Sequence, residues 1–203
     1  MSDHGRLTPE SVSWRVKRES VVLLGAGREL LLQVAHPSVG AGEAPFDDAE
    51  LRWLWATRLE TSLLMYTRYV RPLKVCDVEA YYGEQRDFLL ACDIPEATVP
   101  ETFADFMHWY DGVVEHLLEV TPVAREVAQT VLRPRRPLAL RPAYDALNLA
   151  TIGLLPSSLR DAYGLSWSPQ RERLLGAQTT LVRRLMPLMP SLVRERQLLG
   201  EAA

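Results

Sequence analysis

Three polar residues that could take part in chemistry stand at helical spacing in an otherwise apolar segment: Glu29, Gln33 and His36 lie at positions i, i+4 and i+7. The residues between them are leucine, valine and alanine, so the three side chains form one polar stripe. Burying a polar group without a partner costs about 1–3 kcal/mol, so the stripe predicts hydrogen bonds, a ligand or a metal ion. A core histidine with its hydrogen bonds satisfied is the alternative at His36.

The proline after His36 sets where this helix ends. Pro37 disfavours helical backbone at the residue before it, which places His36 at the carboxyl end of the helix. The helix dipole is negative there and favours a proton on the imidazole. We therefore expect a protonated histidine at the end of the polar stripe.

A glycine-rich string precedes this segment and suggests a nucleotide site. Val21-Val22-Leu23-Leu24 runs into Gly25-Ala26-Gly27, as a strand does in a dinucleotide-binding loop. Such a loop also needs a third small residue where Leu30 stands, and several further strand-helix units, which the sequence lacks. We therefore favour a break between two helices, at which glycine supplies unusual φ values.

The other candidate groups have simpler interpretations. His108 and His116 project away from an apolar stripe and stand among acidic residues, which predicts a solvated acidic face rather than a metal site. A loop from Arg133 to Pro142 is rich in arginine and proline; it could meet phosphate or carboxylate groups, but it is more typical of a solvated connection. No G-x-S-x-G, P-loop, H-E-x-x-H or zinc-type cysteine pair is present.

Cys76 and Cys92 flank one expected helix, which separates them by about 24 Å at 1.5 Å per residue. Because a disulfide needs Cα atoms within about 7 Å, we expect two free thiols. Free thiols are typical of a reducing compartment, and the polar amino-terminal residues lead into no secretory segment. Both observations favour the cytoplasm.

Helix start signals recur along the chain and set the fold class. Each consists of a capping side chain, a proline or acidic residues placed before an apolar-periodic stretch; they stand at Thr8-Pro9, Asp47-Asp48, Asp77-Val78-Glu79, Val99-Pro100, Thr121-Pro122 and Ser168-Pro169. The stretch 101–120 has one clear apolar face, whereas 48–70 is apolar nearly all round and is expected to be central. We predict an all-α bundle of about seven to nine helices.

Composition agrees with one globular domain. The chain has 203 residues, of which 47% are hydrophobic and 24% charged, and its net charge is −3. This length suits a single domain over 1–203, and we expect disordered tails at 1–8 and 196–203. No apolar run approaches the ~20 residues needed to cross a bilayer, and the charge gives no general attraction to nucleic acid.

Short strings along most of residues 12–170 resemble, in their order, the MpaB-type oxygenase family, which includes bacterial latex-clearing protein (rubber oxygenase). The most distinctive is Gln33-Val34-Ala35-His36-Pro37. The others are Trp14-Arg15-Val16, Leu51-Arg52-Trp53-Leu54-Trp55-Ala56-Thr57, Arg71-Pro72-Leu73, Tyr81-Tyr82-Gly83-Glu84, Val99-Pro100-Glu101-Thr102 and Leu159-Arg160-Asp161-Ala162-Tyr163-Gly164.

The resemblance implies a helical fold that holds haem b and an oxygen-dependent oxidation of an apolar substrate. In characterised members the substrate is a polyisoprenoid chain, cleaved at its carbon–carbon double bonds. On this interpretation His36 ligates or lies beside the haem iron and Gln33 orients it. Arg58, or an arginine of residues 133–141, pairs with a propionate.

The sequence departs from the family where the haem ligand is expected. In relatives a segment after the Ala-His-Pro string carries a His-x-x-Val-x-Gly motif that supplies the proximal histidine. Here Gly40 to Pro45 leads almost directly into Asp48, and no histidine follows His36 until His108. Haem iron needs an axial ligand, so His36 is the candidate replacement. The alternative is a shortened, non-catalytic relative that acts as a binding or interaction module, and a lost segment would also leave apolar surface for a second copy to cover.

Overall fold

The computed structural model describes residues 8–41, 45–133 and 138–195, and within them the chain is helical without a strand. Seven helices have at least seven residues, in agreement with the predicted all-α class and helix number. They are α2 (Ala26–Val34), α4 (Asp48–Tyr69), α5 (Val75–Leu90), α6 (Phe103–His116), α7 (Pro122–Leu132), α8 (Arg141–Gly153) and α10 (Pro169–Leu185). The shorter elements are α1 (Val12–Lys17), α3 (Pro37–Ala41), α9 (Ser157–Ala162), α11 (Ser191–Arg194) and the 3₁₀ turns η1 (Ser20–Gly25), η2 (Glu96–Thr98), η3 (Leu138–Leu140) and η4 (Met186–Leu188).

Three of the six predicted helix starts are confirmed at the residue level. Asp47 accepts a hydrogen bond from the Glu50 backbone N–H at 2.8 Å while the Glu50 side chain accepts one from the Asp47 N–H, so a complete capping box begins α4. Thr121 and Ser168 each cap a helix whose first residue is proline. Oxygen acceptors placed directly before an apolar stretch therefore mark these starts reliably.

The other three starts are displaced by two to four residues. The hydroxyl of Ser11 begins α1, and that of Thr102 begins α6, because each accepts a backbone N–H of the first turn. Helix α5 begins at Val75, so Asp77 lies in its first turn. There the carboxylate interacts favourably with the helix dipole and pairs with Arg15.

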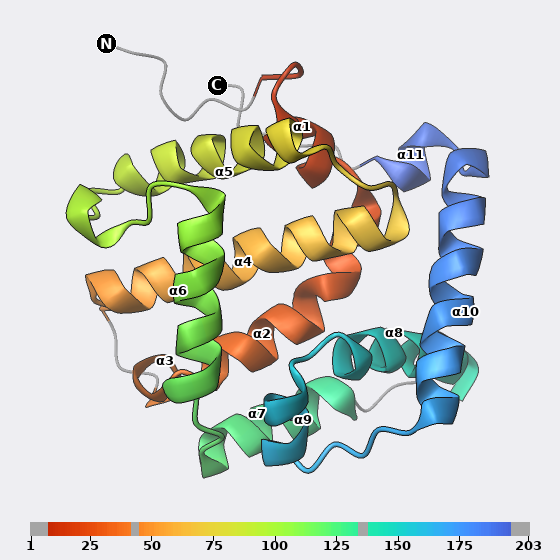
Figure 1. Ribbon diagram of the computed structural model, residues 1–203. Coiled ribbons are helices and arrows are strands. Elements are labelled where there is room, and N and C mark those ends of the chain that lie inside the picture. Colours follow the sequence, from red (N-terminus) through yellow and green to blue (C-terminus); the bar gives the residue numbers. More distant parts are fainter. Residues whose placement is uncertain (1–7, 42–44, 134–137, 196–203) are drawn as a thin grey trace.

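Helix α4 runs through the middle of the molecule, as its apolar sequence predicted (Figure 1). It contacts α2, α5, α10, α1 and η1, which together surround it. Helices α7, α8 and α9 lie together beyond α2, and α10 lies along one side of the molecule (Figure 1). No helix among the described residues is long and apolar enough to cross a membrane.

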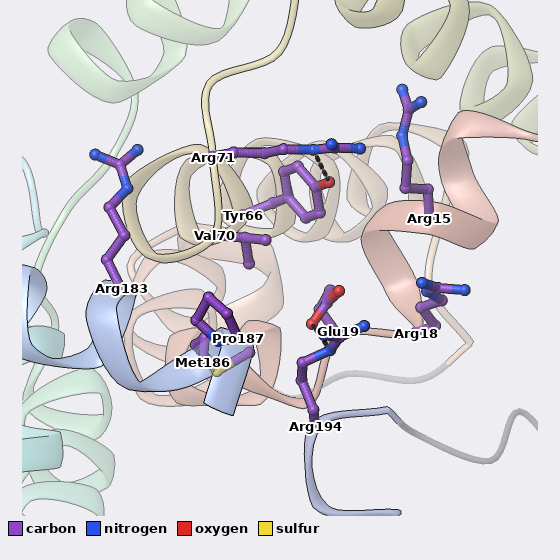
Figure 2. A pocket seen from close by; sticks show the side chains of 10 residues that line it. All are labelled: Arg15, Arg18, Glu19, Tyr66, Val70, Arg71, Arg183, Met186, Pro187 and Arg194. Carbon is purple, nitrogen blue, oxygen red and sulfur yellow. Dashed lines mark hydrogen bonds and ion pairs between the residues drawn. The ribbon is translucent and has the colours of Figure 1, made fainter. Parts of the chain in front are cut away.

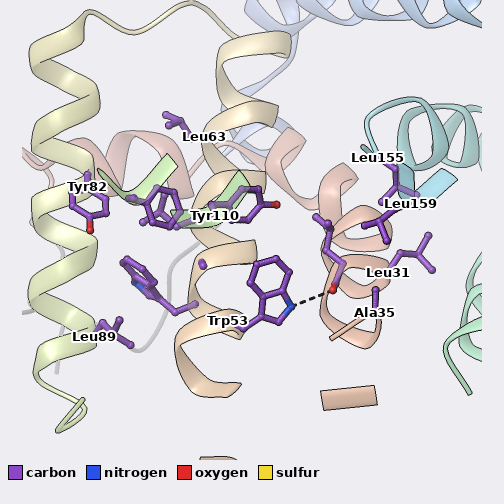
Figure 3. Close-up of a cluster of buried hydrophobic side chains, with 14 of the residues drawn as sticks. Leu31, Ala35, Trp53, Leu63, Tyr82, Leu89, Tyr110, Leu155 and Leu159 are labelled. Carbon is purple, nitrogen blue, oxygen red and sulfur yellow. Dashed lines mark hydrogen bonds between the residues drawn. The ribbon is translucent and has the colours of Figure 1, made fainter. Parts of the chain in front are cut away.

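The core is unusually aromatic around the first half of α4. Trp53 is 1% exposed, stacks on Tyr110 with ring centroids 5.4 Å apart, and donates its indole N–H to the Leu32 carbonyl at 3.2 Å (Figure 3). The neighbouring Trp55 packs edge-on against Phe106. Two tryptophans on one helix therefore fix α2 on one side and α6 on the other.

Helix α6 ends earlier than its apolar period suggested. The sequence predicted a helix over 101–120, but the structure ends it at His116 and leaves Leu117 47% exposed. Beyond that point the backbone N–H of Glu119 donates to the Ala35 carbonyl at 2.8 Å, at the end of α2. A tertiary hydrogen bond thus replaces the last helical turn. The tails predicted to be disordered lie outside the described residues except for Thr8.

Candidate functional site

A groove of about 790 Å³ lies between α2, α4 and α5, and we call it the Gln33 groove. Its apolar lining consists of Leu51, Leu54 and Trp55 on α4 and of Phe88 and Leu89 on α5. Phe88 is 50% exposed and Leu51 39% exposed, so the lining is open to solvent. The volume is within the range of about 300–1,000 Å³ that small-molecule sites occupy.

Polar side chains gather where this groove meets a second cavity of about 340 Å³. Glu29, Gln33 and Arg58 line both cavities. The Gln33 amide nitrogen donates to Glu29 Oε1 and to the Thr57 hydroxyl, both at 3.2 Å. The structure therefore brings together two of the three predicted site residues, Gln33 of α2 and Arg58 of α4, with Glu29 one turn before Gln33 on α2.

The environment of Glu29 changes its acidity. Burial raises the pKa of its carboxyl above the ordinary value, while the Arg58 guanidinium and the Gln33 amide oppose that change. A carboxyl group in this setting can hold its proton more readily than a solvated one. The polar end of the groove can therefore offer an acid, an amide and a guanidinium to one polar group of a ligand.

His36 is separated from this group, which corrects the predicted polar stripe. Helix α2 ends at Val34 with Ala35 as its C-cap, so His36 no longer follows the helical spacing of Glu29 and Gln33. The imidazole stacks on Trp53 with ring centroids 6.0 Å apart, is 7% exposed, and lines none of the four cavities described for this protein. Its Nδ1 is buried without a hydrogen-bond partner.

The expected protonation of His36 is wrong. Burial lowers the pKa of the imidazole, and although Glu50 and Asp47 act in the opposite direction, desolvation is the larger effect. The cost of removing the imidazolium cation from water therefore outweighs the attraction of these two carboxylates.

The residues at His36 do not fit haem. The donor atom itself is suitable, since a neutral imidazole nitrogen without a partner can ligate iron. The surroundings are unsuitable, because the ring lies against Trp53 in the packed core and adjoins none of the described cavities. In the Gln33 groove, Cys92 is the one lining residue of a type that ligates haem iron, and it is exposed. The described residues hold no cluster of three or more His, Cys, Asp or Glu that could bind a metal ion.

A buried charge pair beside the core was not predicted from the sequence. Arg28 is 3% exposed and forms two hydrogen bonds with the Glu60 carboxylate, at 2.5 and 3.1 Å between nitrogen and oxygen atoms. It also donates to the Leu154 carbonyl at 2.7 Å, and the Tyr110 hydroxyl donates to Glu60 at 3.3 Å. The pair joins α2, α4, α6 and α8. A signal was present in the sequence, since Glu60 places a carboxylate next to Leu59 in the middle of the helix expected to be central.

The glycine string serves helix packing and not a phosphate loop. Gly25 ends η1 with an ordinary right-handed φ of −77°, so the expected unusual backbone is absent there. A Cβ at Gly25 would stand 2.5 Å from the Thr61 methyl group, and one at Gly27 would stand 2.6 Å from the Thr151 hydroxyl. The segment before them is a 3₁₀ turn and no strand. Glycine is needed at these two positions because α4 comes close to Gly25 and α8 comes close to Gly27.

The remaining candidates take the simpler interpretation where the structure describes them. His108 is exposed, and the side chain of His116 is 76% exposed beside Glu115. Cys76 and Cys92 are exposed free thiols at the two ends of α5, as predicted. Arginine positions 135 and 136 lie outside the described residues, while Arg133 lines a separate cavity and Arg141 begins α8.

The far side of the groove was missed at the sequence level. Phe88, Leu89 and Gln85 come from α5, whose sequence was interpreted only as a helix with an apolar face. No spacing rule connects them to Gln33, because the groove forms only when α5 packs beside α4. The nearest available signal was Tyr81-Tyr82-Gly83-Glu84, whose last residue lines the groove.

Comparison with known proteins identifies the family. A family model described as the catalytic domain of ER-bound oxygenase mpaB/B' and rubber oxygenase matches residues 43–189. Neither a curated protein nor a solved structure shows a significant match. A catalytic domain of this kind suggests an oxidoreductase. Since the match covers more than half of the 203 residues, the chain belongs to the MpaB and rubber oxygenase family.

Proposed function

We propose that this protein binds an apolar small molecule in the Gln33 groove, the step by which an oxidoreductase of its family would take up its substrate. The observation that carries the proposal is the groove itself, about 790 Å³ with apolar side chains on α4 and α5 and a polar group at its junction with the second cavity. Few convergent polar groups in a mainly apolar cavity are typical of small-molecule sites.

The two parts of the groove have different roles in this proposal. Leu51 and Phe88 are apolar and partly exposed, and covering them would contribute about 25 cal/mol per Å² of apolar surface removed from water. Arg58 supplies hydrogen-bond donors to an oxygen atom of the ligand, and Gln33, whose amide hydrogens are taken by Glu29 and Thr57, can accept a bond through its amide oxygen; together they fix the orientation of the ligand. The ligand class is therefore a largely hydrocarbon molecule with one oxygen-bearing end.

Oxidation of that molecule with haem is a second candidate function, suggested by the family. The observation that favours it is the buried Nδ1 of His36, which has no partner and belongs to an imidazole that burial keeps neutral. The packing of the same ring on Trp53 opposes it, since no described cavity adjoins the ring. Binding without catalysis, as in a shortened relative, is the corresponding alternative.

Binding is tested with farnesol, an isoprenoid alcohol, followed by tryptophan fluorescence because Trp55 lines the groove. We expect saturable binding to the wild-type protein. Phe88→Glu should weaken it at least about tenfold, because the ligand would have to cover a carboxylate. Phe46→Glu is the matched control, since Phe46 is also partly exposed, at 39%, and lies outside the groove.

Absence of binding to the folded wild-type protein, or equal weakening by the two substitutions, would contradict the proposal. Oxidation is assessed separately by incubating the protein with squalene and oxygen and searching for oxygen-containing products by mass spectrometry. Products would support the second candidate, whereas binding without products would support a non-catalytic module.

A further inference from the structure

Five arginines line one small cavity on a different part of the molecule, and we call it the arginine pocket. It has a volume of about 300 Å³ and lies between α1, the end of α4 and the turns that follow α10 (Figure 2). The arginines are Arg15, Arg18, Arg71, Arg183 and Arg194. They come from four separate parts of the chain, since Arg15 and Arg18 both belong to the end of α1, and the pocket shares no lining residue with the Gln33 groove.

The carboxylates near these arginines balance only part of their charge. Three lie within ion-pair distance: Asp77 at 2.8 Å from Arg15, Glu195 at 3.4 Å from Arg18 and 2.8 Å from Arg194, and Glu19 at 3.6 Å from Arg194. Five guanidinium groups thus face three carboxyl groups. Burial also raises the pKa of Glu19, against the effect of Arg194 and Arg18.

Arg71 and Arg183 have no ion-pair partner within the described residues and contact only neutral oxygens. Arg71 Nε donates to the Tyr66 hydroxyl at 3.2 Å, and Arg183 Nη2 donates to the Thr67 carbonyl at 3.0 Å. Both are exposed. Figure 2 shows Arg71 lying across Tyr66 and Arg183 on the other side of Val70. Each guanidinium has five N–H donors, so most donors of these two side chains remain available to a ligand.

Several buried polar atoms of the pocket also lack partners. The Nε atoms of Arg15 and Arg18 are buried without a hydrogen bond, and so are Arg194 Nε and Glu19 Oε2, which stand 3.6 Å apart as an ion pair. These make up half of all such atoms among the described residues. Unpaired buried donors are costly, so the two Nε atoms that have neither a hydrogen bond nor an ion pair, on Arg15 and Arg18, favour a further acceptor near this cavity.

We propose that the arginine pocket binds a phosphate-bearing small molecule. Arg71 and Arg183 would hold the phosphate oxygens, since guanidinium groups match phosphate in bidentate geometry. A phosphate monoester carries nearly two negative charges, which would balance the excess of arginines over carboxylates better than the single charge of a carboxylate ligand. Val70, Met186 and Pro187 line the same pocket and provide an apolar surface for the attached carbon portion.

The test uses phenyl phosphate as the probe and benzoate as its carboxylate counterpart, with binding to the full chain measured by calorimetry at low salt. We expect phenyl phosphate to bind at least about tenfold more tightly than benzoate, and to weaken as sodium chloride is added. Arg71→Gln and Arg183→Gln should each weaken phenyl phosphate binding by about tenfold to a hundredfold, because each removes a charged hydrogen-bond donor.

Arg184→Gln is the matched control, since Arg184 is exposed on the same helix next to Arg183 but does not line the pocket. It should leave the affinity unchanged. Circular dichroism of each variant checks that it is folded. The effect of salt on phenyl phosphate binding is measured on the wild-type protein, so that result does not depend on the folding of any variant. The proposal is overturned if folded wild-type protein does not bind phenyl phosphate, if benzoate binds equally well, or if Arg183→Gln and Arg184→Gln behave alike. None of these outcomes bears on farnesol binding, so the two proposals stand or fall separately.

Discussion

Two opposing effects act on the imidazole of His36, and their balance decides what the residue can do. Its position after α2 favours a proton through the helix dipole, and so do the nearby carboxyl groups of Glu50 and Asp47. Burial against Trp53 acts in the other direction and is the larger effect, so the pKa is lowered. The imidazole is therefore a neutral, packed part of the core near pH 7.

This balance predicts the pH dependence of stability. As the pH falls, the unfolded chain takes up a proton on His36 first, at a pKa near 6.5, because the folded pKa is lower. The stabilising contribution of the neutral ring is thus complete above that pH and is lost as the pH falls toward the folded pKa. The free energies of unfolding of the wild-type protein and of His36→Gln can be measured in urea between about pH 8 and about pH 5. As the pH falls, the wild-type protein should lose more stability than the variant, which has no imidazole to protonate. A difference that stays constant across this range would contradict the lowered pKa.

At the scale of elements, close approach of helices explains residues that looked like a nucleotide loop. Gly25 has an ordinary helical φ, and its lack of a side chain matters because Thr61 and Met65 of α4 lie where a Cβ would be. The sequence alone could not distinguish a glycine required by close packing from a glycine required by an unusual φ, since either requirement places a glycine at a helix junction. The difference depends on α4, which follows more than twenty residues later.

Gly25→Ala should therefore destabilise the protein by about 1–3 kcal/mol through overpacking against α4. Gly83 supplies a matched control, since it lies within α5 and nothing stands within 4 Å of a Cβ built there. Gly83→Ala should stabilise the protein by about 0.5–1 kcal/mol, because alanine has the higher helix propensity. Urea denaturation measures both. A Gly25→Ala variant as stable as Gly83→Ala would mean that α2 and α4 can separate without cost.

Over the whole molecule, the predictable features were those carried by short stretches of sequence. The all-α class followed from caps such as Asp47 and Thr121, and the family followed from the order of short strings, with residues 43–189 matching its catalytic domain. Gln33 was identified because it is polar within an apolar helix and Arg58 because of its charge type alone, and both line one groove.

Features assembled from distant segments could not be predicted in this way. The arginine pocket joins Arg15 to Arg194, and neither residue stands in a pattern that indicates a binding site. Phe88 faces Gln33 only because α5 packs along α4. A one-dimensional pattern records which face of a helix is apolar, but it does not record which other helix covers that face. The single domain over 1–203 and the cytoplasmic location stay predictions.

Whether the packed core around His36 can admit haem is a question about the whole protein that one spectrum can test. Among the residues that the structure describes, His36 is the one buried histidine, and it is stacked on Trp53 inside the core. Haem would have to separate this ring from Trp53, whose indole also holds α2 through the Leu32 carbonyl, and so would disrupt the packing that joins α2 to α4. Protein purified from haem-supplemented cells should therefore be folded and show no Soret absorption. A stoichiometric Soret band that His36→Ala abolishes and His108→Ala preserves would contradict this expectation, and would mean that the core opens at Trp53 to admit the cofactor.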